Sequence, residues 1–159
     1  MRAADGEPHD MKPLPKIAWI LGYAGVLPFF ILTLALWLDK PLPLLGQVRL
    51  DWWLVAYAAI ILTFISAVHW GAALGNQNRL AIQDSKASFI YSVIPPALAW
   101  FTLLLPVKFA LAVLGVLILF AYLADRMFLF PMLNSNYPKL RLNLTLMVTP
   151  LLFIAAAII

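Results

Sequence analysis

The sequence predicts an all-α integral membrane protein, a bundle of five transmembrane helices. Of its 159 residues, 64% are apolar and 11% are charged, and the mean hydropathy is +0.94. Such values lie far from the composition of a soluble domain of this length. Several runs of about 20 residues carry almost no charge, and a run of that length crosses a hydrocarbon core of roughly 30 Å. These observations place most of the chain in a lipid bilayer.

The chain divides into a short polar tail and an apolar domain. Residues 1–16 hold charged side chains and three prolines, a composition that predicts a disordered cytoplasmic tail. Within the tail, Met11 offers an alternative start to Met1. Residues 17–159 form the predicted transmembrane domain, with spans at about 17–38, 52–75, 87–105, 107–127 and 140–159.

The basic residues predict the orientation of the spans, because cytoplasmic loops carry an excess of lysine and arginine. With five spans, eight basic residues fall on the side of the N-terminus and three on the other side. We therefore expect a cytoplasmic N-terminus, a periplasmic C-terminus and a location in a bacterial inner membrane. The eight are Arg2, Lys12, Lys16, Arg79, Lys86, Arg126, Lys139 and Arg141, and the three are Lys40, Arg49 and Lys108.

Polar residues gather near the cytoplasmic ends of the second, fourth and fifth spans. His69 lies about 9 Å before Gly75 along the second span, at roughly 1.5 Å of rise per residue. We expect His69 to face other helices and to pair with Asp125, because an ionisable group inside a span needs a partner. Neighbouring residues on a helix point about 100° apart, so Arg126 is expected to reach the lipid headgroups instead. The candidate cluster is Ser66, His69, Trp70, Asp125, Arg126, Tyr137, Arg141 and Asn143.

The role of His69 stays open between four interpretations. It is either a structural clamp on Asp125, Tyr137 or a backbone carbonyl, or part of a binding site at the cytoplasmic leaflet. A proton relay is disfavoured, because the outer half of the bundle supplies no further titratable groups. Haem ligation is disfavoured as well, because the only other histidine, His9, lies in the tail.

Small residues and prolines mark two further features of the spans. Ala67, Gly71 and Gly75 form a small-xxx-small stripe on which another helix of this chain or of a partner can pack closely. Prolines near the middle of the first, third and fifth spans can kink their helices. They either line a shared mid-membrane site, as in broken-helix transporters, or are simply tolerated there. These prolines are Pro28, Pro95, Pro96 and Pro150.

Several function classes find no support in the residues. Cysteine is absent, which excludes disulfides and thiolate sites, and the spans hold a single carboxylate, too few for a carboxylate metal cage. HExxH, GxSxG and glycine-rich phosphate motifs are missing. The basic residues are scattered, which argues against nucleic acid. We expect no catalytic residue, no metal and no obligatory cofactor, while a bound lipid or quinone stays open.

Five segments together resemble an uncharacterised membrane family that includes transmembrane protein 69 of animals. They are GYAGVLPFF, ILTFISAVHWGAAL, YSVIPPALAW, Asp125 and YPKLRLNLT. Two positions depart from that family pattern, since Ala67 replaces an expected glycine and Asn136 an expected aromatic. The resemblance implies a polytopic fold in a bacterial or mitochondrial inner membrane and implies no activity.

We therefore expect a non-enzymatic membrane protein, an accessory subunit or assembly factor of a larger membrane complex. Its partners would be membrane lipids and either another membrane protein or a second copy of the chain. The alternative is a small transporter or ligand-binding protein whose polar site surrounds His69 and Asp125.

Overall fold

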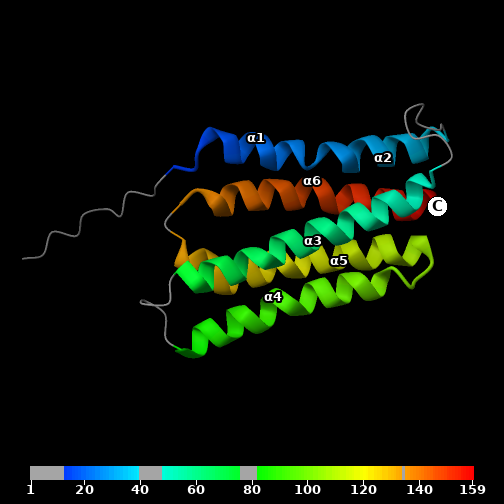
Figure 1. Ribbon diagram of the computed structural model, residues 1–159. Coiled ribbons are helices and arrows are strands. Elements are labelled where there is room, and N and C mark those ends of the chain that lie inside the picture. Colours follow the sequence, from blue (N-terminus) through cyan, green and yellow to red (C-terminus); the bar gives the residue numbers. More distant parts are fainter. Residues whose placement is uncertain (1–12, 40–47, 76–81, 134) are drawn as a thin grey trace, which may run out of the picture.

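The described chain is a bundle of long helices that lie side by side, and successive long helices run in opposite directions (Figure 1). A computed structural model describes residues 13–39, 48–75, 82–133 and 135–159. The charges and the histidine expected at positions 1–12, 40–47 and 76–81 therefore lie outside the described residues. The elements are α1 (Lys16–Ala24), α2 (Leu27–Trp37), α3 (Leu50–Gly75), α4 (Ile82–Thr102), α5 (Val107–Ala124), a π-helical turn (Asp125–Leu129), a 3₁₀ turn (Phe130–Met132) and α6 (Tyr137–Ile158).

The helices alternate in direction, so the chain runs along the length of the bundle several times (Figure 1). Helices α1 and α2 follow one line, α3 and α5 run back, and α4 and α6 run forward. The start of α1, the end of α3 and the start of α6 lie at one end of the bundle, which we call the polar end. The C-terminus lies at the opposite end.

Four helical segments are long and apolar enough to cross a membrane, and they indicate a multi-pass membrane protein. They are Lys16–Trp37, Leu50–Gly75, Val107–Leu129 and Tyr137–Ile158. Helix α4 is of similar length and lies alongside them (Figure 1), but it is less apolar and carries Asp84 and Lys86. A fifth span formed by α4, and the orientation of the bundle, stay predictions.

The boundaries of two predicted spans differ from the observed helices. The span expected at 87–105 is the helix Ile82–Thr102, which starts earlier because helix can extend through polar residues beyond the apolar run. The first span is two helices rather than one, with a break at Gly25 and Val26. Pro28 lies in the first turn of α2, where its missing N–H leaves no helical bond unmade.

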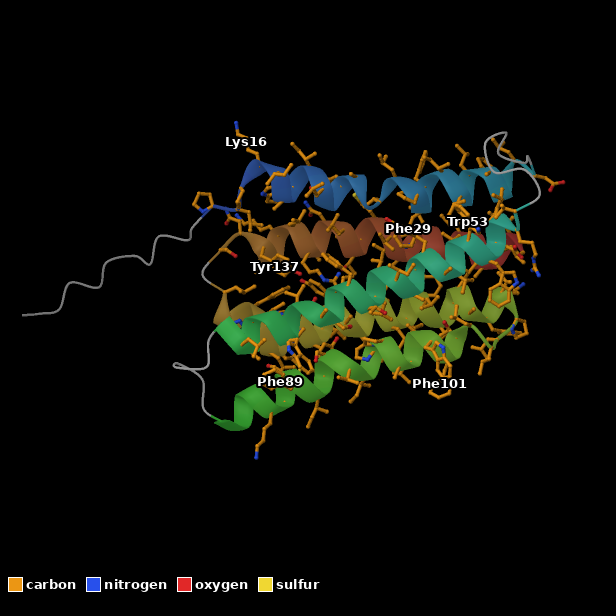
Figure 2. All side chains as sticks on the ribbon, viewed as in Figure 1. Lys16, Phe29, Trp53, Phe89, Phe101 and Tyr137 are labelled. Atoms are coloured by element: carbon orange, nitrogen blue, oxygen red, sulfur yellow. The ribbon has the colours of Figure 1, made fainter. Side chains whose placement is uncertain are left out.

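Large apolar side chains fill the centre of the bundle, and small residues let the helices approach. Phe29, Leu62 and Leu152 are fully buried, and alanines such as Ala110 lie between them. Apolar side chains also cover the outside, as expected where lipid replaces water. In Figure 2, Lys16 and Phe101 project from the outer surface.

The mid-span prolines differ in their burial. Pro95 is buried inside α4, whereas Pro150 lies exposed on the outer side of α6. At the break between α1 and α2, the Gly25 carbonyl accepts a 2.9 Å hydrogen bond from the Tyr57 hydroxyl. Satisfaction by a neighbouring side chain is how membrane helices tolerate such breaks.

The small-residue stripe on α3 is free of packing within the described part of the chain. Ala67, Gly71 and Gly75 are all exposed, and a Cβ added at either glycine would meet no atom within 4 Å. Gly115 on α5 is instead closely packed, because a Cβ there would lie 3.2 Å from the Phe153 ring of α6. A close approach between helices therefore occurs at Gly115, and another at Gly22, where a Cβ would lie 3.2 Å from Leu140; the sequence singled out neither glycine.

Gly115 and Gly71 give a test of the packing. Gly115→Leu should destabilise the protein by about 1–3 kcal/mol, because the added side chain overlaps Phe153. Gly71→Leu should leave the unfolding temperature nearly unchanged, because its side chain enters open space. Thermal unfolding of both variants in one detergent makes the comparison, and an equal loss in both would contradict this packing.

Candidate functional site

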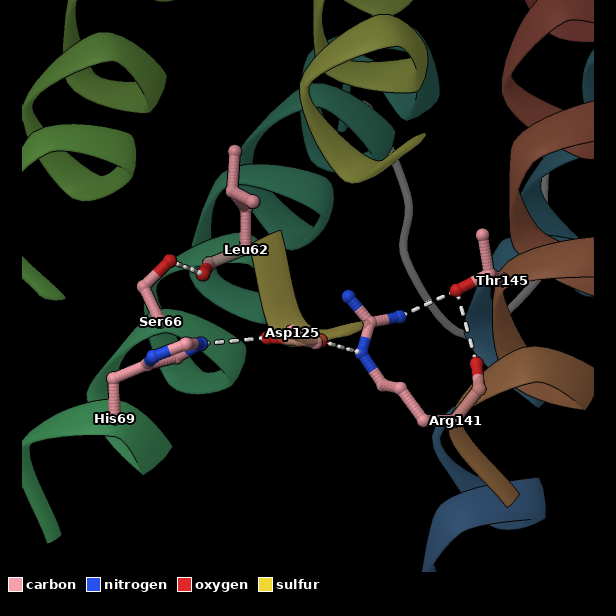
Figure 3. Close-up of polar contacts among 6 residues, drawn as sticks. All are labelled: Leu62, Ser66, His69, Asp125, Arg141 and Thr145. Atoms are coloured by element: carbon pink, nitrogen blue, oxygen red, sulfur yellow. Dashed lines mark hydrogen bonds and ion pairs between the residues drawn. The ribbon is translucent and has the colours of Figure 1, made fainter. Parts of the chain in front are cut away.

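A buried cluster of ionisable side chains joins three helices near the polar end of the bundle. His69 comes from the last third of α3, Asp125 opens the π-helical turn after α5, and Arg141 lies in the second turn of α6. Their exposed fractions are 1%, 0% and 2%. Figure 3 shows the Asp125 carboxylate between the other two side chains. We call these three residues the triad.

Each oxygen of the Asp125 carboxylate has its own partner. Nε2 of His69 lies 2.8 Å from Oδ1, and Nε of Arg141 donates to Oδ2 at 2.6 Å. Because a carboxylate only accepts hydrogen bonds, Nε2 carries the hydrogen when Asp125 is ionised. Asp125 is the partner that topology suggested for His69, whereas its ion pair with Arg141 was not anticipated.

Thr145, one turn after Arg141, forms a second hydrogen bond with the guanidinium. Nη1 of Arg141 donates to the Thr145 hydroxyl, which itself donates to the Arg141 carbonyl at 2.9 Å. The spacing of four residues places both side chains on one face of α6, and this signal could have identified Thr145 from the sequence. Arg141 is thereby fixed on two sides.

Three buried polar atoms around the triad lack a hydrogen-bond partner among the described residues. They are Nδ1 of His69, Nη2 of Arg141 and the hydroxyl of Tyr91. The Tyr91 ring of α4 lies against the His69 ring, with centroids 4.5 Å apart. Sequence reasoning missed Tyr91, because nothing in its segment indicates which neighbouring helix it contacts. Buried polar atoms without partners are uncommon and often mark functional positions.

The backbone at Asp125 departs from a regular α-helix. The N–H of Phe130 bonds to the carbonyl of Asp125, five residues earlier, and Pro131 follows at once. Proline cannot donate the next helical hydrogen bond, so the helix changes its winding here. Asp125 and Leu129 both become buried, while the residues between them are exposed. Such π-turns occur frequently at functional sites.

Three members of the expected polar cluster do not join the triad. Trp70 is exposed and packs edge-on against Phe89, and Arg126 is exposed. Each follows a triad residue directly, and a step of about 100° turns its side chain outward. Asn143 lies two residues after Arg141, about 200° around α6, where it donates to the Tyr23 hydroxyl at 3.1 Å.

Ser66 and Tyr137, two other expected members of the cluster, have no recorded hydrogen bond to the triad among the described residues. The buried Ser66 hydroxyl donates to the Leu62 carbonyl at 2.9 Å, the usual habit of serine in a membrane helix. Tyr137 packs edge-on against Phe130 and lines the cavity described next. The region expected to be polar is therefore a compact triad, with the aromatic rings of Tyr91 and Tyr137 in the surrounding region.

A cavity of about 360 Å³ opens beside the triad. It lies between α1 and α2, α3 and α6, and its wall is almost entirely apolar. Tyr137, Arg141 and Thr145 supply the polar atoms of α6 along it. Apolar residues of the wall include Gly22, Phe29, Ile61, Ile118, Leu144 and Val148.

The chemistry that this site offers is hydrogen-bond donation next to an apolar surface. Among the described residues, no group of three His, Cys, Asp or Glu side chains gathers as a metal site. Both Asp125 oxygens are engaged by the triad itself. Of the three triad residues, Arg141 is the one whose side chain lines the cavity.

Removing the charge of the Asp125 carboxylate should show how much the ion pair with Arg141 contributes to the stability of the protein. Asp125→Asn leaves Arg141 charged and buried without a counterion, a change that destabilises proteins by roughly 3–5 kcal/mol. Arg126→Gln, at the exposed neighbour, should change stability by less than about 0.5 kcal/mol. Thermal unfolding in detergent measures both. Similar unfolding temperatures for the two variants would show that the triad is not paired as described.

Comparison with known proteins identifies the family but no activity. Residues 14–157 match the family model described as "Protein of unknown function (DUF3429)". No curated protein and no solved structure gives a match. Because the match extends over nearly all of the helical bundle, the chain belongs to the DUF3429 family.

Proposed function

We propose that this protein is a non-enzymatic membrane protein that binds a small lipid-soluble ligand in the cavity beside the triad. The observation that carries the proposal is the unpartnered Nη2 of Arg141, on a buried side chain that lines this cavity. The volume of about 360 Å³ lies within the range of roughly 300–1,000 Å³ typical of small-molecule pockets. An apolar wall with few fixed polar groups is also typical of them.

The triad supports this proposal by holding Arg141 in place before any ligand arrives. Asp125 and Thr145 both bond the guanidinium, and His69 holds the second oxygen of Asp125. A donor that is fixed in advance loses little conformational entropy on binding. His69 thus acts as a positioning residue that is two hydrogen bonds away from Arg141 and three away from the ligand.

The membrane setting belongs to the same proposal. We place α4 as a fifth span beside the four apolar segments, with the N-terminus cytoplasmic and the C-terminus periplasmic, in a bacterial inner membrane. The excess of basic residues on one side supports this orientation. The resemblance to the family of transmembrane protein 69 supports an inner-membrane location.

Filling the cavity tests ligand binding. Ala18 lines the cavity, whereas its neighbour Ile17 is exposed on the outer side of α1. A total lipid extract added to delipidated protein should raise the unfolding temperature of the wild type and of Ile17→Trp. Ala18→Trp should fold but gain no stabilisation, because the indole occupies the ligand's space. The same gain in all three proteins would refute binding in this cavity.

A second candidate function is docking to another membrane protein as an accessory subunit or assembly factor. It draws on one observation, the exposed stripe of Ala67, Gly71 and Gly75 on α3. Stripes of this kind let two helices approach closely in a membrane. The partner would be a subunit of a larger complex or a second copy of this chain.

Purification in mild detergent distinguishes docking from ligand binding alone. The wild type should copurify with one defined partner in stoichiometric amount, and Gly71→Leu should lose it while remaining folded. Ala56→Leu, which adds a side chain at another exposed position of α3, should keep the partner. Recovery of a single monodisperse species that is the same for all three proteins would count against docking through the stripe.

A further inference from the structure

The cavity opens sideways, toward lipid. Leu21 of α1 and Phe64 of α3 both line it, yet 63% and 70% of their surfaces are exposed. Both residues lie within the apolar segments Lys16–Trp37 and Leu50–Gly75. Exposed positions inside such segments face the hydrocarbon of the bilayer. A molecule that reaches the cavity through this side must therefore already be dissolved in the membrane.

The length of the cavity matches one leaflet. Its lining on α6 runs from Tyr137 at the polar end to Val148. Eleven residues of helix span about 16 Å, which is close to half of a hydrocarbon core of roughly 30 Å. At its inner end the lining is apolar, with Phe29 and Ile118 beside Val148. This shape suits an extended chain that enters from one side of the bilayer and stops near the midplane.

The unpartnered nitrogen of Arg141, on the wall of the cavity, calls for an uncharged acceptor. Nη2 of Arg141 has no partner within the described residues, and a buried guanidinium N–H without one is costly. The charge of Arg141 is already balanced by Asp125 at 2.6 Å. An anionic ligand would bring a further negative charge next to the buried Asp125 carboxylate, which already balances Arg141. A carbonyl oxygen accepts the hydrogen bond without adding charge.

We propose that the cavity holds one acyl chain of a membrane lipid, whose ester carbonyl oxygen accepts a hydrogen bond from Nη2 of Arg141. The inference rests on the proposed function and names its ligand class. The chain lies along α1, α3 and α6 toward Phe29 and Val148, and the headgroup stays at the polar end near Tyr137. The triad then fixes the position of the ester group.

Comparing the binding of an ester lipid with that of an ether lipid tests whether the ester carbonyl is recognised. A diacyl phospholipid and its dialkyl ether analogue, with one headgroup and one chain length, differ only in the two carbonyl groups. Each is titrated into delipidated wild-type protein while thermal stabilisation is followed. The ester lipid should bind about tenfold more tightly, the change expected for one hydrogen bond to a charged group.

Arg141→Lys provides the matched variant, since lysine keeps the positive charge beside Asp125 and removes the guanidinium fork. In this variant the preference for the ester lipid should disappear. If the variant does not fold, the ester and ether comparison in the wild type decides by itself. Equal affinity of the wild type for both lipids, or stabilisation only by an added membrane quinone, would overturn the proposal.

Photolabelling locates the chain independently. A phospholipid with a diazirine at the middle of one acyl chain should label peptides that contain Phe29, Ile118 or Val148. Ile17→Trp should retain this labelling and Ala18→Trp should lose it. Labelling of the outer surface alone would overturn the inference. If a total lipid extract still stabilises the wild type and not Ala18→Trp, the proposed function survives that failure with a different ligand.

Discussion

The structure depends on one buried carboxylate. Asp125 has no exposed surface, and a carboxylate in a low-dielectric interior is tolerated only with a compensating charge and satisfied hydrogen bonds. Arg141 supplies the charge and His69 the second hydrogen bond. Because the three residues belong to different helices, this requirement fixes α3, the end of α5 and α6 relative to one another. The surrounding apolar contacts favour association of the helices but specify their register less strictly.

The same requirement also fixes the side chain of Arg141 on the wall of the cavity. Nε of Arg141 donates to Asp125 and Nη1 donates to Thr145. Nη2, the third nitrogen of the planar guanidinium, has no hydrogen-bond partner among the described residues. A lysine in its place would be a point charge without this fixed fork. The cavity thus combines an apolar wall with the fixed side chain of Arg141, and an apolar lining with few polar groups is typical of small-molecule pockets.

Several residues that the sequence grouped together face different surroundings. Trp70 and Arg126 are adjacent to triad residues in the chain, but the helical step of about 100° directs them outward. The stripe of Ala67, Gly71 and Gly75 likewise faces away from the bundle. Helix α3 therefore has one face buried inside this chain and another face that is exposed. Apolar lipid-facing and core-facing residues look alike in composition, so composition cannot separate the two faces.

The sequence by itself determined the helical class, the apolar segments and the layer that His69, Asp125 and Arg141 share. Apolar run length and helix rise decide those features, and both are local properties. Only the tertiary structure decided that Arg141 rather than Arg126 pairs with Asp125, that Tyr91 lies against His69, and that a cavity separates α1 from α3. These depend on the rotation of each helix about its axis and on the π-turn after α5. Both are set by packing between distant segments, which no local pattern in the chain records.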